Sequence, residues 1–206
     1  MNGNRTVNPV ILTLMISDSI VLTGFGLVEP VFAIFVSEIH GGSVLSVGIS
    51  TAIFMTVKSL FQLPFSRFVD KHDHSAAHPH RHLATRFLWA GMALILSAPF
   101  LYYFATDIRQ VYAIQALYGL GSALAYPTWL KLWETHIDKG RESFEWTLYS
   151  TVTSMTVALA AVVGGALVEA IGFRETFLVS SVVVATGCAA LVYLKNDAKG
   201  IVFPIK

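Results

Sequence analysis

Three ionisable residues interrupt long apolar stretches of the sequence: Asp18, Glu29 and Lys58. A charged group in a membrane-spanning helix costs at least about 2.5 kcal/mol on insertion scales, so it usually faces a cavity or an oppositely charged partner. Carboxylates in such positions can bind a solute or carry a proton. We therefore predict that the three residues line a pathway or hold helices together.

Asp18 and Glu29 are eleven residues apart, so one continuous helix would place both on one face, about 16 Å apart along its axis. Asp18 and Lys58 lie at similar depths in neighbouring segments, and we expect an ion pair between them. That pair either only holds two helices together or belongs to a solute or proton site. Glu29 precedes Pro30, which frees backbone carbonyls to bind or bend. Glu29 belongs either to the pathway or to a water-exposed vestibule.

A polar stripe runs through a later apolar segment, where four residues recur at helical spacing: Gln115, Tyr118, Ser122 and Tyr126. These side chains either bind a solute or form hydrogen bonds between helices. Gly119 and Gly121 allow close approach of a neighbouring helix.

The longest polar segment, residues 66–86, holds five of the seven histidines: His72, His74, His78, His80 and His82. Imidazole binds Zn²⁺ and Ni²⁺, but the Ser, Ala and Pro neighbours indicate a flexible loop, and no cysteine completes a structural zinc set. We predict no cofactor. Metal sensing and a change of loop charge near pH 6.5, the usual pKa of histidine, remain alternatives.

Composition indicates an integral membrane protein, because 54% of the residues are hydrophobic and only 13% are charged. A span needs about 20 apolar residues. We predict an all-α membrane protein with one six-helix domain over 1–206. Its spans are Pro9 to Val36, Val44 to Phe65, Phe87 to Phe104, Val111 to Lys131, Trp146 to Ile171, and Thr176 to Leu194. The third and sixth spans are poor in polar groups and are expected to face lipid. No phosphate loop, nucleophile elbow or zinc-hydrolase motif is present, so an enzyme is not expected.

Basic residues fall mainly on one side of the predicted membrane: Arg5, those of 66–86, Lys131, Lys139, Arg141 and the tail 195–206. The other side receives Arg109 and Arg174. Basic loops stay in the cytosol. We therefore predict a plasma or inner membrane protein with both termini, the loop 66–86 and the tail 195–206 in the cytosol.

The two halves of the sequence resemble each other. Five residues of the second span (Ser50, Thr51, Met55, Thr56 and Val57) recur at the same spacing in the fifth span (Ser150, Thr151, Met155, Thr156 and Val157). Gly24-Phe-Gly26 is echoed by Gly119-Leu-Gly121. A repeat of three helices must be inverted, because three is odd, and inverted repeats are typical of secondary transporters. Chance coincidence of short Ser/Thr/Val strings is the alternative.

Four segments resemble the major facilitator superfamily. Segment 66–73 keeps the Asp70-Lys71 centre of the family's motif between spans 2 and 3, with Ser66 and Asp73 where the family has glycines. Three further segments are similar to later family motifs: 115–123, with Gln115 in the usual arginine position; Gly164-Gly165, without the family's proline; and the turn 172–177.

This resemblance covers the whole chain but only half of a twelve-helix transporter, in which two six-helix halves hold the solute between them. It implies secondary active transport of a small solute by alternating access. The missing wall would come from a second copy, related by a two-fold axis along the membrane normal. The alternatives are a non-transporting subunit that pairs with another six-helix chain and a metal-responsive transporter.

We therefore expect a solute or proton pathway of five residues: Asp18, Glu29, Lys58, Gln115 and Tyr118. We also expect a cytosolic gate of four residues: Asp70, Lys71, Glu134 and Arg141. The resemblance implies that Asp70 contacts the partner protomer, whereas solvated loop charges would contribute little energy. The expected partners are lipid, a small-molecule solute and a second six-helix unit, and no nucleic acid.

Overall fold

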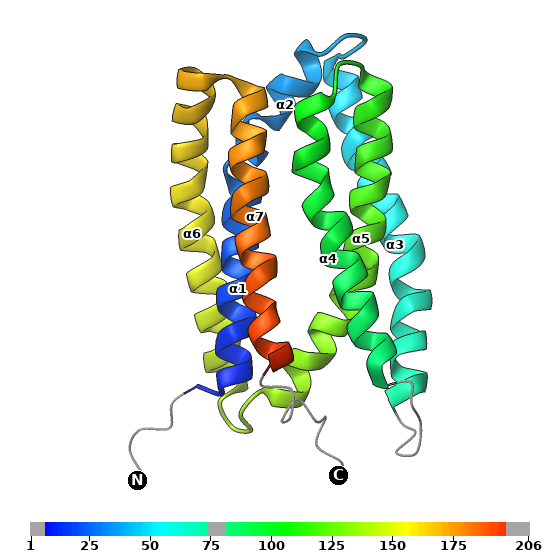
Figure 1. Ribbon diagram of the computed structural model, residues 1–206, viewed down its shortest axis with the longest axis vertical. Helices are drawn as coiled ribbons and strands as arrows, with labels where there is room; N and C mark the ends of the chain where they lie inside the picture. The colour runs from blue at the N-terminus through cyan, green and yellow to red at the C-terminus, as the bar shows by residue number, and fades with distance from the viewer. Residues whose placement is uncertain (1–6, 74–80, 197–206) are drawn as a thin grey trace.

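The computed structural model describes residues 7–73 and 81–196, with the side chains of 7–71 and 86–191. This part of the chain forms seven helices: α1 (Pro9–Gly26), α2 (Glu29–Glu38), α3 (Val44–Asp73), α4 (Arg81–Phe104), α5 (Ile108–His136), α6 (Glu142–Ile171) and α7 (Phe173–Asn196). They form an elongated bundle, and α1 begins at the same end at which α7 finishes (Figure 1).

The long helices form two groups of three. In the first group α1 packs against α6 and α7, and in the second group α5 packs against α3 and α4 (Figure 1). Contacts between α4 and α7 join the groups. The two repeats correspond as α1 to α5, α3 to α6 and α4 to α7. Under this correspondence the pairs α1–α6 and α1–α7 become α5–α3 and α5–α4, which are also in contact, and the pair α4–α7 becomes itself. The all-α fold with two inverted three-helix repeats is therefore confirmed.

Glycines allow the close approach within each group. Gly24 faces α7, where Ser180 Oγ donates to the Gly24 carbonyl at 2.6 Å, and Gly26 faces α6. In α5, Gly119 faces α3 and Gly121 faces α4. The order of the facing helices is thus reversed between the two motifs. Both motifs allow tight packing, but the residue-by-residue equivalence suggested by their spacing is wrong.

The first span is broken. Leu27 and Val28 form a turn between α1 and α2, because Pro30 has no backbone N–H with which to continue the helical hydrogen-bond ladder. Gly164 of α6 lies directly against the Leu27 carbonyl. The expectation of one continuous helix carrying both Asp18 and Glu29 is therefore wrong, because Asp18 lies on α1 and Glu29 on α2.

Within the described residues, five segments are long and apolar enough to cross a membrane: Pro9–Glu38, Val44–Lys71, Arg86–Phe104, Glu142–Ile171 and Phe173–Leu191. The remaining predicted span, Val111 to Lys131, is the fourth in the chain and corresponds to α5, which is comparably long but has no window as apolar as those five and packs inside the bundle. Helices α3 and α4 include residues 66–73 and 81–86, so these parts of the predicted loop are helical. No glycine or proline interrupts residues 66–73, and α3 therefore continues beyond its apolar part.

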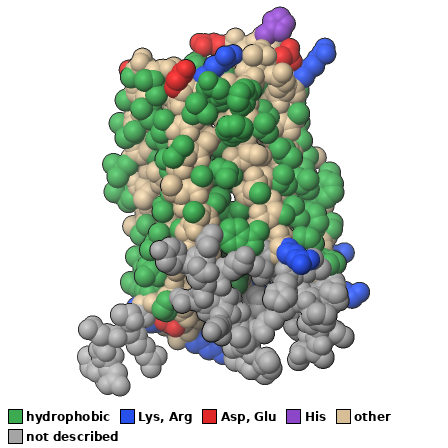
Figure 2. Space-filling model, in the orientation of Figure 1, with side chains coloured by type: hydrophobic (Ala, Val, Ile, Leu, Met, Phe, Trp, Pro, Cys, Tyr) green, Lys and Arg blue, Asp and Glu red, His purple; other side chains and the backbone are tan. Residues whose placement is uncertain are grey.

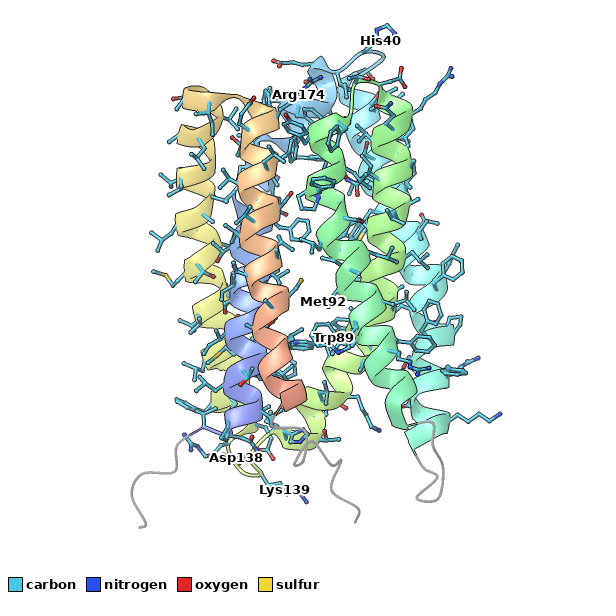
Figure 3. All side chains as sticks on the ribbon, viewed as in Figure 1. His40, Trp89, Met92, Asp138, Lys139 and Arg174 are labelled. Atoms are coloured by element: carbon cyan, nitrogen blue, oxygen red, sulfur yellow. The ribbon has the colours of Figure 1, made fainter. Side chains whose placement is uncertain are left out.

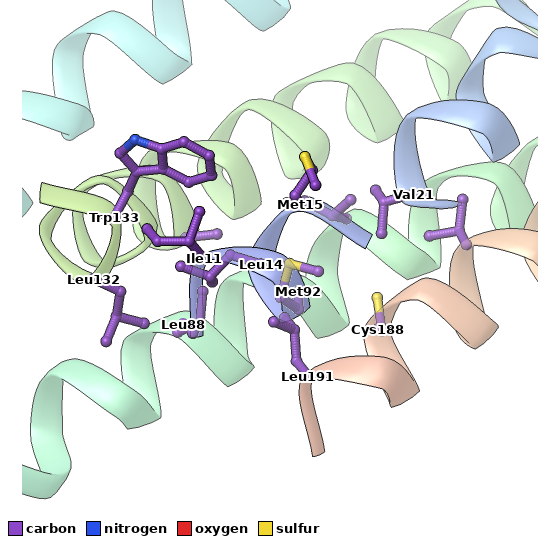
Figure 4. Packing of buried hydrophobic residues seen from close by; sticks show 13 residues of the cluster. Ile11, Leu14, Met15, Val21, Leu88, Met92, Leu132, Trp133, Cys188 and Leu191 are labelled. Atoms are coloured by element: carbon purple, nitrogen blue, oxygen red, sulfur yellow. The ribbon is translucent and has the colours of Figure 1, made fainter. Parts of the chain in front are cut away.

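Two hydrophobic clusters hold the ends of the bundle together. The first includes Ile11, Leu14, Trp133 and Leu191, near the end where α1 begins (Figure 4). The second, near the opposite end, includes Val36, Val111 and Phe177. On the lateral face shown in Figure 2, hydrophobic side chains cover the middle, and charged groups gather at the end that carries His40. This distribution suits a bundle surrounded by lipid.

Helices α3 and α6 are the least covered. In their most apolar windows only 11% and 17% of the residues are buried, against 39% in α4 and 44% in α7. Contrary to the expectation from polarity, the third and sixth spans are thus not the most exposed helices of this chain. Polarity does not show how many neighbours a helix has, and α4 and α7 also pack against each other.

Candidate functional site

Two cavities lie between the two helix groups, one above the other along the bundle. The cavity that we call the Asp18 cavity has a volume of about 240 Å³, and the Glu29 cavity has about 430 Å³. Residues of both groups line them. Leu22, Phe25 and Tyr118 belong to the walls of both cavities.

Asp18 lies in the wall of the Asp18 cavity, and a neighbouring helix holds its side chain. Its Oδ2 accepts a hydrogen bond from the Tyr149 hydroxyl of α6. Polar groups of α5 complete this wall, namely Ser122, Tyr126 and Trp129. The indole Nε1 of Trp129 is buried and has no hydrogen-bond partner among the described residues. The wall therefore combines a carboxylate with an indole whose N–H is buried and has no partner among the described residues.

Lys58 of α3 lines the same cavity but does not pair with Asp18. Its Nζ lies 5.8 Å from the ring centroid of Phe54 and 5.5 Å from that of Tyr126. Among the described residues no ion pair joins Lys58 to Asp18, whereas Lys131 and Asp70 do form an ion pair. The predicted Asp18–Lys58 pair is therefore wrong, because the aromatic faces and the Tyr149 hydroxyl hold the two charges separately.

The Glu29 cavity brings together side chains from six helices, α1 to α6. Glu29 of α2 and Thr51 of α3 are exposed, and Gln115 of α5 is buried. Gln115 forms no side-chain hydrogen bond with another described residue. The hydroxyl of Tyr102 is buried and also lacks a partner among them. These groups leave hydrogen-bonding capacity that the described residues do not use.

Three aromatic rings stack where the two cavities adjoin. Tyr118 stacks between Phe25, at a centroid distance of 4.8 Å, and Phe54, at 4.5 Å. The rings come from α5, α1 and α3, so both helix groups contribute to this aromatic stack. Phe25 and Tyr118 line both cavities, and Phe54 lines the Glu29 cavity. A role of Tyr118 in a pathway stays a prediction.

Sequence reasoning missed several lining residues, above all Tyr149. It is the only tyrosine in the predicted span Trp146 to Ile171, and a hydroxyl in an apolar helix usually finds a polar partner. That signal pointed to a buried acceptor. Phe25, Phe54 and Tyr102 had no comparable signal, because aromatic residues are common in apolar spans.

The four predicted gate residues lie at the end of the bundle where α1 begins, the end marked by Asp138 and Lys139 in Figure 3. Asp70 Oδ1 lies 3.7 Å from Lys131 Nζ of the same chain. Lys71 and Glu134 are exposed, and the Arg141 guanidinium lies 5.1 Å from the Phe144 ring centroid. A contact of Asp70 with a second protomer stays a prediction.

The histidine candidates fall outside the described side chains. His74, His78 and His80 lie in the segment 74–80, and the side chains of His72 and His82 are also not described. Among the side chains that are described, no three His, Cys, Asp or Glu residues come together as metal ligands.

Comparison with known families agrees with this architecture. The sequence model for the Major Facilitator Superfamily matches residues 14–205, which include the residues lining both cavities. The match begins within α1 and extends through α7. The chain therefore belongs to the Major Facilitator Superfamily, as an integral membrane protein of this transporter family with about half of its usual twelve helices.

Proposed function

We propose that the chain is one half of a secondary active transporter that moves a small solute by alternating access. The observation that carries this proposal is the pair of cavities between the two helix groups, each of which combines helices of both repeats. Asp18, Lys58 and Glu29, the three ionisable residues expected in a pathway, all line these cavities. Two cavities stacked along the bundle, with a barrier between them, suit a transporter whose solute site is open to one side of the membrane at a time.

The barrier of Phe25, Tyr118 and Phe54 separates the compartments in the proposed cycle. Rocking of the first helix group against the second would part the three rings and join the cavities. Asp18 is the proposed proton-coupling carboxylate, because it lies beside the barrier and a hydroxyl donor orients it. Gln115 and Glu29 would contact the solute on the other side.

A second six-helix unit would complete the pathway. The sparsely covered helices α3 and α6 expose large apolar side chains, including Leu60 and Leu159, each 66% exposed. Met55 and Met155, which match in the two repeats, lie on these exposed faces. A second copy related by a two-fold axis along the membrane normal would cover both helices. In the proposed orientation the start of α1 and the C-terminal end of α7 face the cytosol.

Cysteine accessibility tests alternating access without knowledge of the solute. The single cysteine, Cys188, is first replaced by serine. Ser122→Cys then reports on the Asp18 cavity, and Thr51→Cys on the Glu29 cavity. A membrane-impermeant thiol reagent is added to either side of oriented proteoliposomes. Ser122→Cys should react from the side of the α1 start, and Thr51→Cys from the opposite side. Val182→Cys, exposed on the lateral surface of α7, is the lipid-facing control.

Two results would contradict the proposal. Cavity cysteines as unreactive as Val182→Cys would indicate sealed protein. A strict monomer in the bilayer, measured by cross-linking through Leu159→Cys on α6, would leave the pathway without its second wall. Cross-linking to a different six-helix chain, together with unreactive cavity cysteines, would favour the non-transporting subunit.

A further inference from the structure

We infer that the Asp18 cavity selects a small zwitterion with an apolar body, such as an aliphatic amino acid. The inference deepens the proposed function and rests on it. In this arrangement the ammonium group of the solute faces Asp18 and its carboxylate faces Lys58.

The two charges of the cavity call for this combination. Among the described residues that line it, Asp18 is the only one with an acidic side chain and Lys58 the only one with a basic side chain. They lie on different helices, they do not pair with each other, and neutral groups hold each of them. A charge in the membrane interior needs an opposite charge or water. A solute with one charge satisfies one residue and leaves the other unmatched, whereas a zwitterion satisfies both.

The remaining walls suit a compact apolar body. Phe25, Met92 and Ile95 contribute apolar surface to the cavity, and in Figure 3 Met92 projects from α4 in the middle of the bundle. The volume of about 240 Å³ equals about eight water molecules at about 30 Å³ each. That space accommodates an amino acid of the size of leucine.

A second observation points to a ligand in the same place. The Nε1 of Trp129 is a buried donor without a partner among the described residues, and the Trp129 side chain lines the cavity. Buried donors are rarely left unused. Because Nε1 is buried in this structure, the indole must turn toward the cavity before a solute carboxylate can accept from it.

A matched set of probes separates the two charges. L-Leucine carries both, 3-methylbutylamine lacks the carboxylate, and 4-methylpentanoate lacks the ammonium group. Binding to the full chain in nanodiscs is measured by quenching of tryptophan fluorescence and by thermal stabilisation. Leucine should bind at least tenfold more tightly than either analogue. This comparison needs no variant and therefore does not depend on the folding of one.

Two substitutions should change the selectivity in opposite directions. Asp18→Asn should weaken leucine binding at least tenfold and leave 4-methylpentanoate as the better ligand. Lys58→Met should instead favour 3-methylbutylamine. Glu169→Gln and Lys139→Gln remove exposed charges outside both cavities and should leave the order of affinities unchanged.

Three outcomes would overturn the assignment. The analogues bind as tightly as leucine, no probe binds, or the Asp18→Asn/Lys58→Met double variant binds leucine with the affinity of the wild type. The last result would show that leucine does not need the two side chains and that each only offsets the charge of the other within the bundle. If the cavity cysteines react from opposite sides but the protein does not bind leucine, the zwitterion assignment is refuted and the proposal of a transporter is retained. Selective leucine binding with cavity cysteines that react from one side only would retain the zwitterion and refute alternating access.

Discussion

The Tyr149 hydroxyl of α6 donates a hydrogen bond to the Asp18 carboxylate of α1, across the first helix group. The bond connects the first helix of one repeat with the middle helix of the other. Hydrogen bonds to an ionised group are stronger than those between neutral groups. Tyr149 therefore fixes the direction in which Asp18 faces its cavity.

Tyr149→Phe removes this donor and keeps the ring. We expect the protein to lose about 1.5–3 kcal/mol of stability, because the Asp18 carboxylate loses a charge-assisted hydrogen bond inside the bundle. Unfolding in detergent, followed by tryptophan fluorescence, measures the change. Tyr103→Phe, a partly buried tyrosine outside both cavities, is the control and should behave as wild type. Equal stability of the two variants would show that Asp18 does not depend on Tyr149.

Tyr118→Ala removes the ring between Phe25 and Phe54 and should join the two cavities. A cysteine at Thr51 should then react at least several-fold faster with an impermeant reagent added from the side of the α1 start. Tyr118→Phe keeps the stacked ring, so its rate should match that of the parent. An unchanged rate in Tyr118→Ala would place the barrier elsewhere.

Gly164→Ala puts a methyl group against the Leu27 carbonyl, where the backbone cannot retreat easily. We expect a loss of about 1–3 kcal/mol through overpacking. The adjacent Gly165 has open space on its side-chain position, so Gly165→Ala should leave the stability unchanged or raise it by up to about 1 kcal/mol. Thermal unfolding of both variants gives the comparison. Equal changes of stability in the two variants would mean that the contact with the α1–α2 break does not determine the effect.

Asp70→Asn removes the ion pair with Lys131. Asp70 is 59% exposed, so the loss within the chain should be only about 0–1 kcal/mol. If Asp70 also contacts a second protomer, the same substitution should raise the dimer dissociation constant and increase the reactivity of a cysteine at Ser122 from the side of the α1 start. Measuring stability and dissociation together separates the two roles. Unaltered dissociation and reactivity would make Asp70 a solvated surface charge.

Sequence alone predicted the class of fold and much of the pathway. Long apolar segments determine spanning helices because lipid offers no partner to the backbone, and the spacing of Gln115, Tyr118 and Ser122 placed one face of α5 along the cavities. The similar depth of Asp18 and Lys58 in the membrane did not predict correctly whether they form an ion pair, since the two residues line one cavity without contact. The direction of a side chain depends on the rotation of its helix about its own axis, which packing with distant segments determines.

Each helix group combines segments from both repeats, and this affects biosynthesis. When α1, α3 and α4 have entered the bilayer, the principal neighbours of α1 and α3 have not yet been translated, because α1 packs on α6 and α7, and α3 on α5. These early helices must persist separately in lipid, each stabilised by its own backbone hydrogen bonds. Tertiary assembly of α1 and α3 therefore awaits the synthesis of α5, α6 and α7.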